Sequence, residues 1–274
     1  MSPYRDTYIV KMNRRDFSAT KEKFNRGNTL SIDDDFIYIA SILGDKEDIF
    51  KYDKNTLRKV SQKTISDENV NIIRGIVNVN GELYTLVGTV NRQNFSKGTY
   101  LWKMDKDLNI IEKIDLNYTT GGYLKMVLVG EYLYMIEGTN GVTSAGEPGP
   151  GNNLVTYNIK TKEIKKVQLT TPYPYNLYYD KNNNNLIIQH YGVYEKDFPF
   201  TIYSLDNKTE KIIKLPEYKD KGSNISSFTY GKDNYYFLLG NIDMVVKYDL
   251  KTKEIKKFDL KEFSVKKPHS VVAK

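Results

Sequence analysis

The stretch Lys247-Tyr-Asp-Leu-Lys-Thr-Lys-Glu-Ile-Lys-Lys-Phe-Asp-Leu260 recurs along the chain and decides its fold. Residues 154–169 are almost the same text, and looser copies occupy residues 49–60, 101–116 and 201–215. Apolar and polar residues alternate on both sides of a short polar turn, which predicts a β-hairpin. Short side-chain acceptors that can bond nearby backbone N–H groups lead into four of the turns: Asp53, Asp105, Asn158 and Asp249.

Two further strands are predicted upstream of each hairpin. The stronger of the two covers residues 36–41, 82–87, 132–136, 185–189 and 235–239, and turn residues such as Asn80-Gly81 separate it from a weaker strand before it. Four antiparallel strands in a repeat of this length form one blade of a β-propeller. The sequence therefore predicts a single all-β propeller domain over residues 1–274, with blades at approximately 28–65, 73–116, 123–169, 175–215 and 225–260.

The ends of the chain predict a sixth blade. Residues 5–24 resemble the last two strands of a unit, and residues 264–274 offer a first strand. A propeller that pairs its two chain ends within one blade leaves no open edge. Six blades are the preferred count, while seven or five blades remain open.

The connections between second and third strands differ in length and would all emerge on one face. They are long in the second, third and fourth blades, at residues 88–98, 138–153 and 189–199, and very short in the fifth, at 240–243. Long loops in compact domains are enriched in function, although added loop residues also cost little. We expect ligand binding on this loop-rich face, around the central channel.

Candidate ligand-binding residues stand in these loops and near the starts of the innermost strands. Tyr123 and Tyr175 could stack on a planar ligand, or pack between blades. Polar candidates could approach the channel. The full set is Arg74, Arg92, Tyr123, Lys125, Tyr175, Asn176, His190, Tyr191 and Asn224.

Catalytic motifs are absent from the sequence. It has no nucleophile elbow, phosphate loop, dinucleotide fingerprint or zinc-protease motif. The two histidines, His190 and His269, are candidates for acid/base work or ordinary surface residues. We predict no metal site and no cofactor, because no carboxylate cluster accompanies the histidines; the Asp33-Asp-Asp35 run is interpreted as a solvated turn.

Charge and composition limit the classes of binding partner that the sequence favours. The formal net charge is +7, but lysines and acidic residues alternate through the turns, so we expect a solvated surface and no nucleic-acid partner. No apolar run is long enough to cross a membrane. Cysteine is absent, which excludes disulfides and thiolate chemistry. We expect a monomer that binds a small molecule, a glycan or a protein.

The repeats resemble β-propellers with YVTN/YncE-like, quinoprotein-dehydrogenase-like repeats. The resemblance covers nearly the whole chain through a Leu-Tyr … Tyr-Asp-x-x-Thr-x-Glu-Ile pattern, seen at residues 82–111 and 235–255. It implies a propeller fold and a tendency toward extracytoplasmic binding, and it transfers no catalytic residue. Streptogramin lyases share the fold, but no matching histidine and glutamate set occurs here.

These observations favour a non-enzymatic binding propeller, secreted or on the cell surface, whose export signal has been removed. The alternative is a propeller lyase or hydrolase with its active site at the channel mouth and His190 or His269 as general base. An intracellular scaffold is a third possibility.

Overall fold

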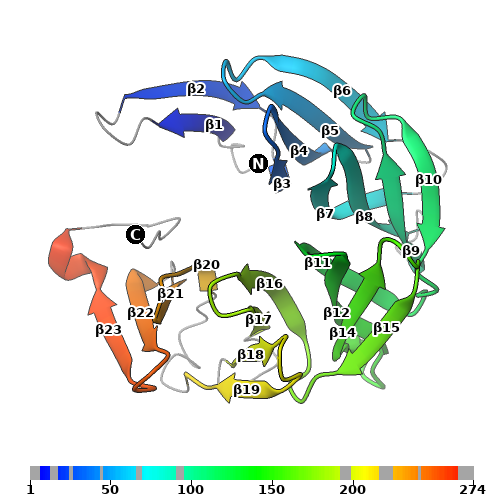
Figure 1. The fold of residues 1–274 in the computed structure, drawn as a ribbon. Coiled ribbons are helices and arrows are strands. Elements are labelled where there is room, and N and C mark those ends of the chain that lie inside the picture. Colours follow the sequence, from blue (N-terminus) through cyan, green and yellow to red (C-terminus); the bar gives the residue numbers. More distant parts are fainter. Residues whose placement is uncertain are drawn as a thin grey trace. The chain divides into compact units, whose positions relative to one another are not determined.

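The computed structural model describes residues 7–12, 18–24, 27–43, 46–65, 70–90, 96–191, 199–215, 225–239 and 242–264. These residues form antiparallel β-sheets and one short 3₁₀ helix, Leu260–Phe263 (Figure 1). No helix among them is long and apolar enough to cross a membrane. The chain divides into two compact units, Met1–Gly149 with Val155–Lys165, and Pro150–Leu154 with Lys166–Lys274.

The first unit carries a two-stranded sheet followed by three larger ones. The strands of the first two sheets are β1 (Thr7–Met12) and β2 (Ala19–Phe24), then β3 (Gly27–Ile32), β4 (Phe36–Leu43), β5 (Lys46–Asp53) and β6 (Lys59–Ile65). The next sheet has β7 (Val70–Val79), β8 (Glu82–Val90), β9 (Ser96–Met104) and β10 (Ile110–Asp115). The last has β11 (Gly121–Val129), β12 (Tyr132–Val142), β14 (Asn153–Asn158) and β15 (Ile164–Gln168), with β13 (Pro148–Pro150) paired to β12.

The second unit contains two four-stranded sheets. The first is built from β16 (Pro174–Asp180), β17 (Asn185–His190), β18 (Phe200–Ser204) and β19 (Glu210–Ile213). The second is built from β20 (Ile225–Tyr230), β21 (Asn234–Leu239), β22 (Met244–Asp249) and β23 (Ile255–Asp259). In each larger sheet of the molecule the strands pair in chain order, so the predicted four-strand repeat is confirmed.

The repeated hairpin turns are held as the sequence predicts. The side chain of Asn158 accepts hydrogen bonds from the backbone N–H groups of Lys160 at 2.8 Å and Thr161 at 3.0 Å. Asp249 does the same for residues 251 and 252, each at 2.9 Å, and Asp53 and Asp105 also cap their turns. The fourth residue after Asn158 and after Asp249 is a lysine with positive φ, Lys162 and Lys253, which closes the turn onto the next strand.

The cores of the units lie between consecutive sheets. In the first unit, strands β3, β7 and β11 lie side by side on the inner edges of their sheets, and β6 and β10 lie on the outer edges (Figure 1). Buried side chains from neighbouring sheets pack together there, for example Ile49 with Ile73, and Leu86 with Met126. In the second unit, Phe200 of β18 packs on Phe237 of β21, with ring centroids 4.2 Å apart.

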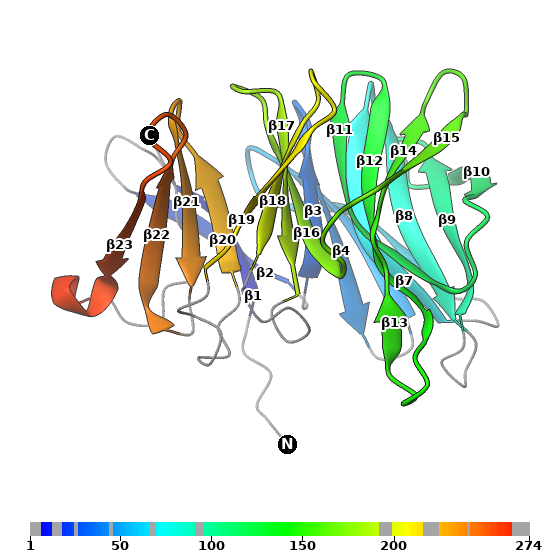
Figure 2. The same ribbon diagram turned by 90° about the horizontal axis from the view of Figure 1, so that it is seen from below.

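The longest predicted loop is largely regular structure. β12 continues to Val142, a turn follows, and β13 returns along it, so most of residues 138–153 form a hairpin arm that projects beyond the rest of the sheet (Figure 2). Gly149 is required in this arm because a Cβ atom there would lie only 2.2 Å from the carbonyl oxygen of Asn140. The strands flanking the second-blade connection are also longer than predicted, which leaves residues 91–95 between β8 and β9.

Candidate functional site

The innermost strand of every larger sheet contains a β-bulge at the same place. The pairing of each first strand with its second skips one residue, four or five positions before the first strand ends. The skipped residues are Asn28, Arg74, Lys125, Tyr175 and Ser226. A bulge takes a residue out of the regular ladder and re-aims it, and bulges are common beside functional sites. Three of the five, Arg74, Lys125 and Tyr175, are predicted ligand-binding residues.

Arg74 and Lys125 are brought together by an unusually close approach of β7 and β11. Gly75 follows the first bulge and Met126 follows the second. A Cβ atom on Gly75 would lie 3.0 Å from the Cβ of Met126 and 3.2 Å from its backbone nitrogen. Any side chain at position 75 would be crowded by Met126, because carbon atoms normally approach to about 3.5–4.0 Å. The two bulged cations therefore stand on adjoining backbones.

The environment of Lys125 is unfavourable for a cation. Burial lowers the pKa of Lys125, and the nearby charge of Arg74 lowers it further. Lys125 is partly buried, while Arg74 is exposed. Within the part of the chain that the structure describes, the Lys125 side chain has no hydrogen bond or ion pair. Its backbone also has φ +51°, a left-handed conformation that costs a non-glycine residue about 1–2 kcal/mol.

A buried carboxyl group lies close to Arg74. Glu47 of β5 is 3% exposed, and burial raises its pKa to about 8 against the lowering effect of the Arg74 charge. The Glu47 carboxyl is therefore mostly protonated at neutral pH and compensates little of the positive charge. The neighbouring Asp48 accepts a hydrogen bond of 2.5 Å from the Thr64 hydroxyl. Glu47 and Asp48 were not among the predicted site residues, because in the sequence they belong to the short polar stretch 44–48, which looks like a solvated connection.

In the second unit, the bulge of β16 presents an aromatic residue. Tyr175 is 38% exposed, and its ring meets that of Tyr191 edge to face, with centroids 5.0 Å apart. The next residue, Asn176, donates a 2.9 Å hydrogen bond to the side-chain oxygen of Gln189 on β17. The structure thus groups three of the predicted residues, Tyr175, Asn176 and Tyr191, at one end of this sheet. Gln189, which is 2% exposed, completes the group.

His190 is enclosed in the core of its sheet. It is fully buried, its Nδ1 lies 2.8 Å from the carbonyl oxygen of Pro172, and its Nε2 lies 2.9 Å from the Thr201 hydroxyl. A carbonyl can only accept, so Nδ1 carries the proton and Nε2 accepts from Thr201. Burial lowers the pKa of His190 to about 4. This geometry gives the histidine a structural role and leaves it no access to a substrate.

Tyr123 is also inaccessible. It is fully buried, and its ring stacks on that of Tyr118, with centroids 4.5 Å apart and an interplanar angle of 6°. The structure therefore supports packing, the alternative to ligand stacking that the sequence left open. The remaining candidates, Arg92, Asn224 and His269, lie outside the described residues. Among the described residues, no three histidine, aspartate or glutamate side chains are placed to hold a metal ion.

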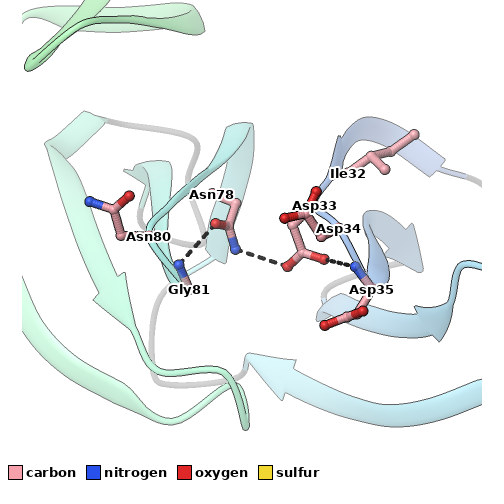
Figure 3. Close-up of a pocket in the computed structure, with 7 residues that line it drawn as sticks. All are labelled: Ile32, Asp33, Asp34, Asp35, Asn78, Asn80 and Gly81. Carbon is pink, nitrogen blue, oxygen red and sulfur yellow. Dashed lines mark hydrogen bonds between the residues drawn. The ribbon is translucent and has the colours of Figure 1, made fainter.

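A hollow of about 490 Å³ lies between the β3–β4 and β7–β8 turns of the first unit (Figure 3). Asp33 caps its own turn by accepting hydrogen bonds from the N–H groups of Asp35 and Phe36, and its second oxygen accepts from the Asn78 amide at 3.1 Å. Asn78 in turn accepts from the Gly81 N–H. Asp33 therefore caps its turn and links two sheets, and it is partly buried, whereas Asp34 and Asp35 are exposed as the sequence predicts.

Comparisons with known proteins identify the fold. No known family matches the sequence, and no curated protein is similar to it. Among solved structures, Kuenenia stuttgartiensis hydrazine synthase is similar over 89% of this chain and 71% of that chain, with 12% identity and a TM-score of 0.60. A chain of a nidogen/laminin complex is similar over 96% and 92%, with 13% identity and a TM-score of 0.58. The Neurospora crassa Pan2 WD40 domain is similar over 85% and 65%, with 10% identity and a TM-score of 0.57.

These neighbours are β-propeller proteins, and the chain has a β-propeller fold. Because the sequence identities are only 10–13%, the similarity supports a conclusion about the fold and none about function. Function must therefore be argued from the residues that the bulges present.

Proposed function

We propose that this chain is a non-enzymatic binding protein that holds a ligand or partner at the bulged ends of its innermost strands, on the loop-rich face. The repeated bulge carries this proposal. The same backbone device recurs in five sheets, yet the residues it presents are as different as Arg74, Lys125 and Tyr175. A device needed only for packing would favour one kind of side chain, whereas bulges that serve binding can present different side chains in each unit.

The burial of the neighbouring residues supports the same conclusion. The residues opposite the bulges of β7 and β11 are core residues, Leu86, Val87, Met135 and Ile136, all 0% exposed. Arg74 is exposed, Lys125 is partly buried and Tyr175 is 38% exposed. A rigid scaffold thus positions accessible side chains, which is the arrangement that pre-organised binding requires.

Nothing favours the enzymatic alternative through His190, because both of its ring nitrogens are occupied and no solvent reaches the ring. The finer features of the fold belong to this proposal as well. We infer six blades with YncE-like repeats and an extracytoplasmic location. The closing strand expected at residues 264–274 lies, apart from Ser264, outside the described residues. Cell fractionation with an antibody against the chain tests the location.

A thermal-shift screen tests the binding function. The full chain would be screened against sugars, amino acids, nucleotides and organic acids, and each hit would be repeated with Arg74→Gln, Lys125→Gln and Tyr175→Ala. We expect hits whose stabilisation is lost in at least one bulge variant and kept in the control Lys162→Gln, since Lys162 is an exposed turn residue paired with Glu112 at 2.7 Å. Hits that stabilise all bulge variants as well as the wild type would overturn the assignment of the site.

A further inference from the structure

The first unit places two cations at matching positions on adjoining strands. Arg74 and Lys125 occupy the same bulge position in adjoining sheets, and Gly75 lets their backbones approach until a Cβ atom would be 3.0 Å from Met126. Like charges held side by side repel each other, and the repulsion grows as water is removed. At the Lys125 position, where burial and the Arg74 charge both disfavour the cation, a neutral side chain would be more stable.

A buried carboxyl group, Glu47 of β5, lies close enough to Arg74 to feel its charge. Glu47 is buried and mostly protonated at neutral pH. Asp48 is 5% exposed and engages the Thr64 hydroxyl. Glu47 therefore brings little negative charge to Arg74 at neutral pH.

We propose that Arg74 and Lys125 together bind an oxyanion, a carboxylate or phosphate group of the ligand. This inference rests on the proposed binding function and specifies its chemistry. Arginine presents a planar fork of donors that suits two oxygens of one anion, and lysine adds a compact charge. The anion relieves the repulsion between the two cations. The left-handed backbone of Lys125 is the kind of local strain that persists where a side chain is held for a ligand.

The proposal assigns a role to Glu47 too. An ionised carboxylate beside Arg74 would compete with the incoming anion, and burial raises the pKa of Glu47 to about 8, so that the carboxyl is mostly protonated at neutral pH. Above a pH of about 8, Glu47 becomes charged and offsets Arg74. Anion affinity should therefore fall as the pH rises through 8, and the fall should be smaller in Glu47→Gln.

Calorimetric titration of the full chain tests the proposal, with inorganic phosphate and citrate as probes at pH 7 and constant ionic strength. We expect saturable binding of at least one probe, weakened about tenfold or more in Arg74→Gln and in Lys125→Gln, because each variant removes a charge-assisted hydrogen bond. Lys162→Gln removes the same charge elsewhere in the unit and should bind as the wild type does. Phosphate and citrate arms together show whether the site prefers a phosphate or a carboxylate.

Absence of saturable binding by either probe, or equal weakening in Lys162→Gln, would overturn the anion assignment. The proposed function is tested separately. If uncharged compounds in the thermal-shift screen stabilise the wild type but not the bulge variants, the binding function stands even though the anion assignment is wrong. A second measurement needs no ligand. The pKa of Lys125, followed by NMR after ¹³C-methylation of the lysines and assigned with Lys125→Arg, should lie below 10.5 and rise in Arg74→Gln. An unchanged pKa in Arg74→Gln would contradict the proximity of the two cations.

Discussion

Replacing Gly75 with alanine should destabilise the first unit by forcing β7 away from β11. The added Cβ would lie 3.0 Å from the Met126 Cβ and 3.2 Å from the Met126 backbone nitrogen, so the strands must separate by a few tenths of an ångström. Overpacking of this kind costs about 1–3 kcal/mol. Alanine in place of glycine within a strand returns about 0.5–1 kcal/mol, which leaves a net loss of roughly 0.5–2 kcal/mol.

Thermal unfolding followed by circular dichroism measures this loss. For a domain of this size the expected decrease in Tm is about 1–8 °C. Gly122→Ala is the matched control: this glycine also lies in β11, and a Cβ there would have nothing within 4 Å, so its Tm should stay the same or rise slightly. A Gly75→Ala protein as stable as Gly122→Ala would refute the close approach of the two strands, and with it the reason why Arg74 and Lys125 are neighbours.

Three further substitutions test other parts of the account. Burial lowers the pKa of His190 to about 4 from an ordinary 6.5, so its neutral form stabilises the fold by up to about 3 kcal/mol above pH 6.5, and this stabilisation is lost as the pH falls toward 4. His190→Asn keeps a donor toward Pro172 and should make the free energy of unfolding in urea less dependent on pH between 6.5 and 4. An equally steep pH dependence in the variant would contradict burial of a neutral imidazole. The pH dependence that Glu47 causes has the opposite sign: its pKa is raised from 4.5 to about 8, so stability falls as the pH rises from 4.5 to 8. Glu47→Gln should therefore be more stable than the wild type at pH 8.5, by a few kcal/mol at most, and a wild type more stable than the variant at that pH would contradict the burial of this carboxyl. Asn158→Ala removes two turn hydrogen bonds and should cost about 1–2 kcal/mol, while Asn158→Asp, the residue found in three sister turns, should cost little; equal losses in the two variants would show that the side-chain acceptor is not what matters.

The repeat of the hairpin text made most of the fold predictable. Alternation locates strands well, and the turn residues at Asp53, Asp105, Asn158 and Asp249 mark the joints between the third and fourth strands. The arm at residues 138–153 could not be predicted in the same way. It is rich in glycine and proline, and such composition usually indicates a loop, yet Gly149 is what allows β13 to lie against β12.

The bulges were hidden from sequence analysis because a skipped residue reverses the alternation at one point in a strand. Arg74, Lys125 and Tyr175 were nevertheless selected, since polar or large residues near the start of an innermost strand do not fit a core. Their common register position emerges only from the pairing. Glu47 offered no signal, because its burial depends on β7, which lies in the next sheet.

His190 shows what alignment of the repeats could have added. Its pairing position in β17 corresponds to Val87 in β8, Ile136 in β12 and Leu239 in β21, all of them 0% exposed. The predicted strand ended at Gln189, one residue too early, which placed the histidine in a loop. Extending that strand by one residue would have assigned His190 to the core.

The most direct test of the account is a crystal structure of the chain grown with saturating citrate or phosphate. The account predicts an oxyanion in contact with both the Arg74 guanidinium and the Lys125 ammonium, with Lys125 keeping its left-handed backbone. A structure in which the anion binds elsewhere, or in which Arg74 and Lys125 point apart with only solvent between them, would contradict it.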